Sequence, residues 1–272
     1  MSLTFWTTLQ LRKQAVLVKG GKIVRAIPEQ PPKTIYRRAA VVTEYNEKIA
    51  LVRQASFELW SRTTLECHKS FPHVMIYTPH DVVQVGENIL ICSSGLEMFF
   101  LMDIDGKVSW DWWGYKQGLG AENKYFLRSD WEINQAVSDL CAPPEKDRAH
   151  FNSIWMSGEK TFLTAALKKK KIIEITIGED GYKHIADVDE VGCHSPFFQK
   201  TGTLIYGTEE GIRVGKKKVL QQFKWVKYIR PFEDGFAFAH ESGIALVDAK
   251  WKLKENIRLP LPYKFAFMER KR

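Results

Sequence analysis

The chain has 272 residues, 44% of them hydrophobic, and its 40 lysines and arginines outnumber its 32 aspartates and glutamates, for a formal net charge of +8. This composition excludes a disordered or collagen-like chain. No stretch reaches the roughly 18 unbroken apolar residues that a membrane-spanning helix requires, because even the richest, residues 89–102, contains Ser93, Ser94 and Glu97. The start of the chain lacks the pattern of a signal peptide. We therefore expect a soluble cytoplasmic protein without a membrane partner.

The four cysteines form no CxxC pair and no disulfide-dense pattern, which is typical of a reducing compartment. Cys67 is followed directly by His68, but adjacent residues of a strand point to opposite faces. We therefore interpret the cysteines as buried or surface thiols rather than as a nucleophile with its base. They are Cys67, Cys92, Cys141 and Cys193.

Short β-rich segments follow one another along the chain. Residues 14–27 (QAVLVKGGKIVRAI) predict a hairpin that turns at Gly20-Gly21. Residues 37–62 then begin the first copy of an internal repeat, and later copies open at His80, His150 and His194. Each copy holds a short apolar run, a glycine turn and further alternating strands. A copy without the histidine begins near Arg230, and a last strand-like segment, YKFAFME, follows it.

The spacing of these copies predicts the fold. They start near residues 38, 80, 150, 194 and 230, and a four-stranded propeller blade takes roughly 40 to 50 residues. We therefore predict an all-β protein, a β-propeller of five or six blades that forms a single domain over residues 1–272. The N-terminal hairpin and the last strand can combine into a further blade. A β-sandwich or an elongated stack of sheets is the alternative fold.

Only the step from residue 80 to residue 150 is much longer than a blade. Residues 114–149 account for the excess, and their "SDWEINQAVSDL" stretch predicts a helix within an insertion. Because this segment connects an outer strand to the next inner strand, we expect it to cover one mouth of the propeller channel as a lid.

Residues that open successive blades should form a ring at that mouth, because every inner strand starts on the same side. Histidines from different blades could hold a divalent metal ion with an open position, or act as proton carriers or nucleophiles. Arginines would bind an anionic substrate, and an aspartate and an asparagine next to histidines would orient a ring nitrogen or contact substrate. The predicted catalytic and metal-binding residues are His80, His150 and His194, and the predicted substrate-binding residues are Arg38, Asp81, Asn152 and Arg230.

A structural interpretation stays open for the same residues, in which each histidine caps a strand or bonds to a neighbouring blade.

Two lysine runs, residues 168–171 and 216–218, occupy the hairpin after the second strand in two copies and are expected on the histidine side. They favour anions there, or are solvated hairpin tips. Nucleic acid is not favoured, because no binding motif accompanies the positive charge.

One blade carries a resemblance to a known family. The run "PHDVVQVGENILICSSG" followed by "DIDGKVSWDWW" resembles the arylsulfotransferase-like propellers. In that family a channel histidine accepts the sulfuryl group, and the resemblance implies this role for His80 or His150. The histidine-led blades also look like those of metal-dependent propeller lyases and lactonases.

Two hypotheses for function follow. The first is an enzyme, a transferase, lyase or hydrolase, that transforms a small anionic or aromatic substrate at the histidine-lined mouth, with a divalent metal ion as its possible cofactor. The second is a non-catalytic propeller whose basic face binds an acidic protein, a glycan or nucleic acid.

Overall fold

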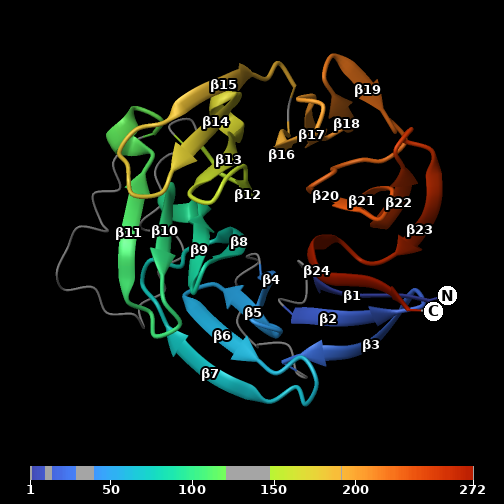
Figure 1. Ribbon diagram of the computed structural model, residues 1–272, viewed down its shortest axis with the longest axis horizontal. Coiled ribbons are helices and arrows are strands. Elements are labelled where there is room, and N and C mark those ends of the chain that lie inside the picture. Colours follow the sequence, from blue (N-terminus) through green and yellow to red (C-terminus); the bar gives the residue numbers. More distant parts are fainter. Residues whose placement is uncertain (1, 10–13, 29–39, 121–147, 191, 272) are drawn as a thin grey trace.

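The chain forms six four-stranded antiparallel sheets around a common axis, as Figure 1 shows in a view down that axis. In this computed structural model, the structure describes residues 2–9, 14–28, 40–120, 148–190 and 192–271. The prediction of an all-β propeller is confirmed, and the number of blades is six. Among the described residues, no helix is long and apolar enough to cross a membrane.

Blades 1 to 3 follow the chain, and in each the strands run in sequence order from the inside to the outside. Blade 2 contains the short 3-10 turn η1 (Ser94–Leu96), and blade 3 the corresponding turn η4 (Leu167–Lys169). Blade 1 consists of β4 (Val41–Tyr45), β5 (Lys48–Arg53), β6 (Ser56–Trp60) and β7 (Cys67–Pro72); blade 2 of β8 (Pro79–Val85), β9 (Asn88–Ser93), β10 (Met98–Met102) and β11 (Val108–Trp113); blade 3 of β12 (Trp155–Met156), β13 (Thr161–Ala166), β14 (Lys171–Thr176) and β15 (Lys183–Asp187).

Blades 4 and 5 continue in the same way, and blade 6 closes the ring. Its inner strand comes from the C-terminal part of the chain and its outer three from the N-terminal part. Blade 4 consists of β16 (His194–Phe198), β17 (Leu204–Thr208), β18 (Gly211–Val214) and β19 (Lys217–Val219); blade 5 of β20 (Tyr228–Phe232), β21 (Gly235–His240), β22 (Gly243–Asp248) and β23 (Leu253–Arg258); blade 6 of β24 (Pro262–Lys271), β1 (Ser2–Leu9), β2 (Gln14–Lys19) and β3 (Lys22–Ile27).

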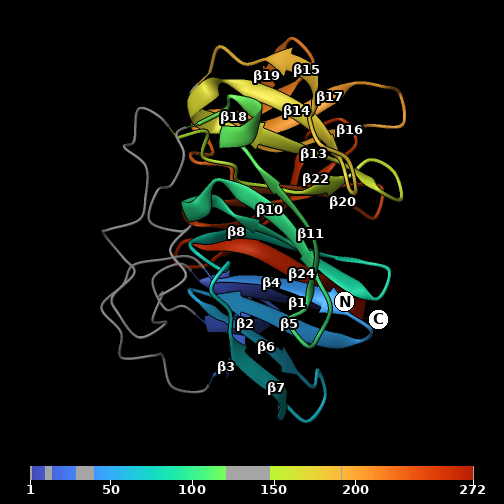
Figure 2. The same ribbon diagram turned by 90° about the vertical axis from the view of Figure 1, so that its left-hand side faces the viewer.

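The expected combination of the N-terminal hairpin with the last strand is therefore confirmed. β2 and β3 form that hairpin, and β1 pairs with both β2 and β24. Figure 2 shows the ring from the side, with β24 and β1 next to β4 of blade 1.

Alternating apolar residues pack each blade against both neighbours. On β9, Ile89 and Ile91 face blade 1, whereas Leu90 and Cys92 face blade 3. Side chains of a strand alternate between the two faces of a sheet, so a strand between two other sheets must be apolar on both faces. Six buried clusters, one at each junction between neighbouring blades, form the core.

Two predictions need correction, one about the start of blade 3 and one about a lysine run in blade 4. The inner strand of blade 3 begins at Trp155, several residues after His150, and is preceded by an isolated bridge between Phe151 and Ala166. The second lysine run, Lys216 to Lys218, follows the third strand of blade 4, at the β18–β19 turn. Because successive antiparallel strands reverse direction, that turn lies at the opposite end of the blade from the β17–β18 turn, so this run is not on the histidine side. Lys168 lies in the β13–β14 turn, as expected.

The structure does not test the predicted lid. Residues 121–147 lie outside the described part of the chain, and so does the helix predicted for them. The segment begins, after β11, with the 3-10 turn η2 (Tyr115–Gln117), which Gly118 ends in the left-handed conformation.

The junction between blades 5 and 6 offers a test of ring closure. Phe265 on β24 is buried and packs edge to face on Tyr228 of β20, with the ring centroids 4.9 Å apart. We expect Phe265→Ala to lower the free energy of unfolding in urea by about 3–5 kcal/mol, as for other buried phenylalanines. Phe198→Ala, at an exposed phenylalanine of β16, is the control and should cost less than about 1 kcal/mol. Equal effects of the two substitutions would contradict this account.

Candidate functional site

The three predicted histidines come together at one mouth of the channel. His80 follows the first residue of β8, His150 precedes blade 3, and His194 is the first residue of β16. The ring centroids of His80 and His150 are 4.8 Å apart, edge to face. Charge on His80 would lower the pKa of both His150 and His194, and charge on His194 that of His150. Blades 2 and 3 therefore contribute two imidazoles in ring contact, and His194 of blade 4 lies within electrostatic range of both.

The histidines nevertheless occupy different positions in their blades. Ser93 and Ala166 are equivalent positions, because each directly precedes the 3-10 turn of its blade. Pro79 pairs with Ser93 and Phe151 with Ala166, so Pro79 and Phe151 are equivalent as well. The residue equivalent to His80 in blade 3 is therefore Asn152 rather than His150. His150 corresponds to Thr78, and both have a positive φ, 56° and 49°. The sequence alignment was wrong here by two residues.

Burial keeps the three imidazoles neutral. It is the main cause that lowers the pKa of His80 to about 4, of His150 to about 2 and of His194 to about 3. The neighbouring Lys227 lowers the pKa of His80 and His194 further. At neutral pH each ring therefore has one nitrogen with a lone pair, which is able to accept a proton, attack an electrophile or bind a metal ion.

The hydrogen bond of His80 defines which nitrogen carries that lone pair. Nδ1 of His80 lies 3.0 Å from the carbonyl oxygen of Thr78. A carbonyl oxygen only accepts hydrogen bonds, so Nδ1 of the neutral ring carries the proton and Nε2 carries the lone pair. Nδ1 of His194 has no hydrogen-bond partner among the described residues, although His194 is only 6% exposed.

Two further residues of this mouth, Lys227 and Tyr263, are missed by the sequence analysis. The Tyr263 ring lies 5.9 Å from the His80 ring, and Lys227 Nζ lies 6.0 Å from the centroid of Tyr263. Each follows by two residues a left-handed residue before an inner strand, as His80 follows Thr78. The left-handed residue is Trp225 before Lys227 and Leu261 before Tyr263, so no single residue type marks this turn in the sequence. The sequence search for histidine could not find them.

Arg230, predicted to open blade 5 at the mouth, is the third residue of β20 and lies deeper in the channel. Its guanidinium donates to the carbonyl oxygens of Ile154 (2.8 Å) and Ile229 (2.9 Å). It also lies over the Tyr228 ring, 4.1 Å from the centroid. Nη2 of Arg230 is 3.8 Å from a carboxylate oxygen of Asp81.

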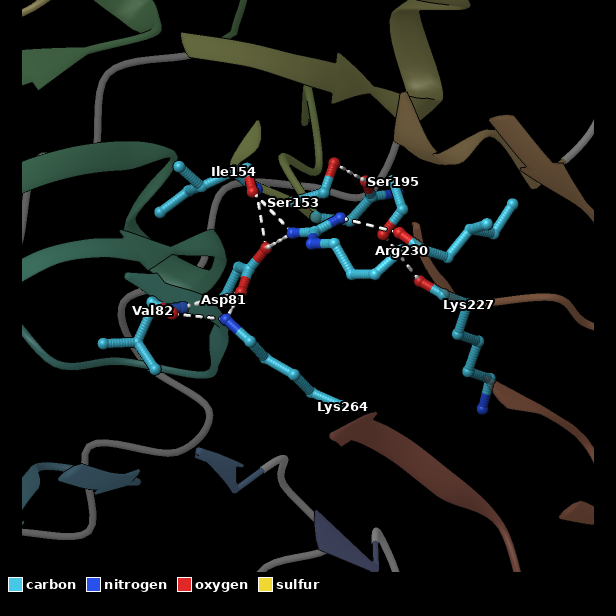
Figure 3. A network of polar contacts seen from close by, with 10 residues as sticks. Asp81, Val82, Ser153, Ile154, Ser195, Lys227, Arg230 and Lys264 are labelled. Atoms are coloured by element: carbon cyan, nitrogen blue, oxygen red, sulfur yellow. Dashed lines mark hydrogen bonds and ion pairs between the residues drawn. The ribbon is translucent and has the colours of Figure 1, made fainter. Parts of the chain in front are cut away.

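Asp81 is the centre of the polar network in the channel, which Figure 3 shows. Its carboxylate accepts hydrogen bonds from the amides of Val82 (2.8 Å) and Ile154 (2.6 Å). It also binds the ammonium group of Lys264, which is 2% exposed and donates a second bond to the carbonyl of Val82. The sequence predicted that Asp81 orients a histidine ring, but its described bonds go to Lys264 and the backbone instead.

The other two predicted substrate-binding residues have different outcomes. Asn152 is buried, and its amide donates to the carbonyl oxygen of Cys193 at 2.7 Å, which joins blade 3 to the start of blade 4. Its carbonyl oxygen accepts a hydrogen bond from Ser153. Arg38 lies outside the described residues.

Glu97 fixes the backbone at His150. It lies at the end of η1 in the left-handed conformation, and one carboxyl oxygen accepts hydrogen bonds from the amides of Ala149 (2.5 Å) and His150 (2.9 Å). Burial raises the pKa of Glu97 to about 7, against the lowering effect of these two bonds. The sequence analysis gave no role to Glu97. The feature that could have indicated one is a single carboxylate in an otherwise apolar hairpin.

The described residues contain no group of three or more histidine, cysteine, aspartate or glutamate side chains arranged to hold a metal ion. The divalent ion at His80, His150 and His194 therefore stays a prediction, and we derive no step through it.

Comparisons with known proteins agree on the propeller fold. No protein-family model matches the sequence, and no curated protein matches it. Among solved structures, a protein of unknown function from Bacteroides caccae superimposes with a TM-score of 0.68 at 9% identity, over 100% of both chains. A chain of a nidogen–laminin complex gives 0.66 at 12% identity, over 97% of both chains. A streptogramin B lyase gives 0.62 at 10% identity, over 98% of this chain and 84% of that one.

The chain is a six-bladed β-propeller. Identities this low show the fold alone, and the neighbours include a lyase as well as a chain from a nidogen–laminin complex. Function must therefore be argued from the residues of the channel.

Removing the Asp81 carboxylate should leave Lys264 buried without its counter-charge. We expect Asp81→Ala to lower the free energy of unfolding by about 3–5 kcal/mol, measured by urea denaturation. Adding Lys264→Met should recover part of this loss, because the uncompensated charge is then gone. The control is Asp105→Ala, which breaks an exposed ion pair with Lys69 and should cost less than about 1 kcal/mol. A loss at Asp81 as small as this control would contradict the network.

The neutral histidines also predict how stability depends on pH. Their folded pKa values lie below the ordinary value of 6.5, so the unfolded chain takes up protons first as the pH falls. The free energy of unfolding should therefore decrease below about pH 6.5, by up to about 2 kcal/mol per buried histidine at pH 5. Glu97, whose folded pKa is raised, acts in the opposite direction between about pH 4.5 and 7 and offsets part of this loss.

The test compares urea denaturation at pH 7 and pH 5. His194→Gln should reduce the difference between the two pH values by about 2 kcal/mol. His184→Gln, at an exposed histidine of β15, should leave it unchanged. If His194→Gln keeps the full difference, His194 is not a buried neutral ring.

Proposed function

We propose that this chain is an enzyme whose histidine-lined channel mouth transforms a small anionic or aromatic substrate. The observation that carries the proposal is the contact between two buried imidazoles from neighbouring blades, the His80 and His150 rings 4.8 Å apart, with His194 of the next blade in electrostatic range. Side chains that are kept neutral by burial near cations are typical of catalytic groups. The lyase among the structural neighbours agrees with a catalytic use of this fold.

His80 is the proposed proton acceptor or nucleophile. Its Nδ1 donates to the Thr78 carbonyl, which leaves the lone pair on Nε2 and holds the ring in one orientation. His150, in edge contact with His80, and His194 are the partners for proton transfer. Lys227 and Arg230 would stabilise negative charge that develops on the substrate. This set of groups serves proton abstraction by a lyase, activation of water by a hydrolase, and group transfer alike.

Sulfuryl transfer is the specific reaction that the resemblance to arylsulfotransferase-like propellers implies. In such a transfer a neutral imidazole nitrogen attacks the sulfur of an aryl sulfate, the bond from sulfur to the aryl oxygen breaks, and the phenolate leaves. A second phenol or water then takes the sulfuryl group and releases the imidazole. Burial lowers the pKa of both His80 and His150, which keeps the attacking form present. Aryl sulfates are therefore the first substrates to assay.

A binding module is the second candidate. The basic turn at Lys168 and Lys169 lies on the same side as the histidines, and one structural neighbour is a chain of a protein–protein complex. In this case the mouth would bind an acidic protein, a glycan or nucleic acid without turnover. Cys67, Cys92 and Cys193 are free thiols, which supports the proposed cytoplasmic location. That location suits either candidate function.

The decisive experiment measures turnover of a panel of aryl sulfates, aryl esters and lactones by the purified chain. His80→Gln, which keeps a donor for the Thr78 carbonyl, should reduce kcat/KM at least about 100-fold. His184→Gln should leave it unchanged. Metal content of the wild type and of His150→Ala, measured on the same preparations, tests the predicted divalent ion.

Two outcomes would contradict the enzyme hypothesis. One is unchanged turnover in His80→Gln. The other is a wild-type chain that turns over no member of the panel but binds an acidic macromolecule through Lys168 and Lys169, which would favour the binding module.

A further inference from the structure

The left-handed residue before an inner strand is held by the preceding blade. In blades 2 and 3 this residue is Thr78 and His150, with φ of 49° and 56°. The amide of Thr78 donates to Oε1 of Gln54 at 2.9 Å, and the amide of His150 donates to a carboxyl oxygen of Glu97, also at 2.9 Å. Both acceptors lie in the turn between the second and third strands of the blade before. Two different side chains therefore make the same connection between blades.

Blade 5 makes this connection with the backbone. Its left-handed residue is Trp225, with φ of 52°, and the amide of Trp225 donates to the carbonyl oxygen of Glu209 at 3.1 Å. Glu209 lies in the β17–β18 turn, which is the corresponding turn of blade 4. The connection thus recurs around the propeller, and blades 2 and 3, whose histidine rings are in contact, use a side chain for it.

The conformation that these bonds support is unfavourable for the residues that adopt it. Positive φ is rare for a β-branched residue such as Thr78 and for a bulky one such as His150. Such backbone strain persists only where surrounding contacts determine the conformation, and it is typical of functional sites. The bonds from Gln54 and Glu97 are contacts of this kind.

Glu97 acts directly on the backbone of His150. The same carboxyl oxygen also accepts a hydrogen bond from the amide of Ala149 at 2.5 Å, so it holds two successive peptide groups. Glu97 is itself fixed, because it is only 1% exposed and its carbonyl oxygen accepts a hydrogen bond from the amide of Gly114 at 2.9 Å. Its side chain therefore sets the direction in which the His150 ring leaves the backbone.

Gln54 acts on His80 through one intermediate residue. It holds the amide of Thr78, and the carbonyl oxygen of Thr78 accepts the hydrogen bond from Nδ1 of His80 at 3.0 Å. That bond orients the His80 ring, whose centroid lies 4.8 Å from that of His150. Each ring of the pair is thus oriented by a side chain from the preceding blade.

We infer that Gln54 and Glu97 are positioning residues of the proposed reaction, which keep the rings of His80 and His150 in contact. This inference rests on the proposed function, because it assigns the chemistry to these two rings. Each side chain acts through backbone amides. Its loss should therefore lower the rate of the chemical step more than it weakens substrate binding.

The first measurement is of the ring contact itself, by NMR of the chain labelled with 13C in its histidine rings, at pH 8. We expect an NOE between ring protons of His80 and His150, whose signals are assigned by their absence in His80→Gln and His150→Gln. Glu97→Ala and Gln54→Ala should each lose or weaken this NOE. Glu97→Gln should keep it, because the amide oxygen of glutamine accepts the same hydrogen bonds.

The matched control is Glu47→Ala. Glu47 is also a left-handed glutamate, with φ of 62°, but it is exposed in the β4–β5 turn. That turn joins the first and second strands and lies at the other end of the blade from the turn that holds Gln54. Glu47→Ala should keep the NOE between His80 and His150.

The second measurement is turnover of a substrate from the panel that the wild type converts. Glu97→Ala and Gln54→Ala should each lower kcat about 10- to 100-fold and change KM by less than about threefold. Glu97→Gln and Glu47→Ala should stay near the wild type. A merely structural role would lower stability without this division between kcat and KM.

The role of either residue is overturned if its folded alanine variant keeps the wild-type NOE, or loses it while kcat is unchanged. Gln54 is half-buried in a turn, so Gln54→Ala keeps the inference testable if Glu97→Ala does not fold. Failure of the proposed function is distinguishable, because it appears as absent turnover in a wild type whose NOE still depends on Gln54 and Glu97.

Discussion

The buried carboxylate of Asp81 is the interaction on which the centre of this propeller depends. It lies on β8 of blade 2 and binds the amide before β12 of blade 3, the lysine on β24 of blade 6 and, more distantly, the arginine on β20 of blade 5. Apolar side chains hold each blade to its two neighbours, but they act only between adjacent blades. The charged network instead connects inner strands across the channel, so it fixes the geometry within which the mouth residues meet.

That geometry explains why the imidazoles can be neutral and close together. Rings that were protonated would repel one another and Lys227, and burial already makes their charged forms costly. A cluster of neutral rings next to fixed cations is stable only while no ring is charged. The proposed catalytic role depends on this arrangement, because only a neutral imidazole has a lone pair that can accept a proton or attack an electrophile.

The sequence contains enough information for the fold and less for the site. The propeller of five or six blades and the closure of the ring follow from the repeat and from the Gly20-Gly21 hairpin, because turn residues and period-two strands are local properties. That the blades number six comes from the structure. Side-chain partners across the channel are not local. Asp81 was assigned to a histidine because His80 precedes it, yet its partner Lys264 lies 183 positions later. His150 was aligned with His80 by residue type, whereas strand register makes Asn152 its equivalent.

Closure of blade 6 by its inner strand has a consequence for how the protein is made. β24 follows every other strand in the chain, and it carries both Lys264, the partner of Asp81, and Tyr263 of the mouth. During translation, five blades and three strands of the sixth leave the ribosome before this strand does. A nascent chain therefore holds the Asp81 carboxylate without its lysine until β24 has been synthesised, and the polar interior of the channel is completed only after that strand joins the ring.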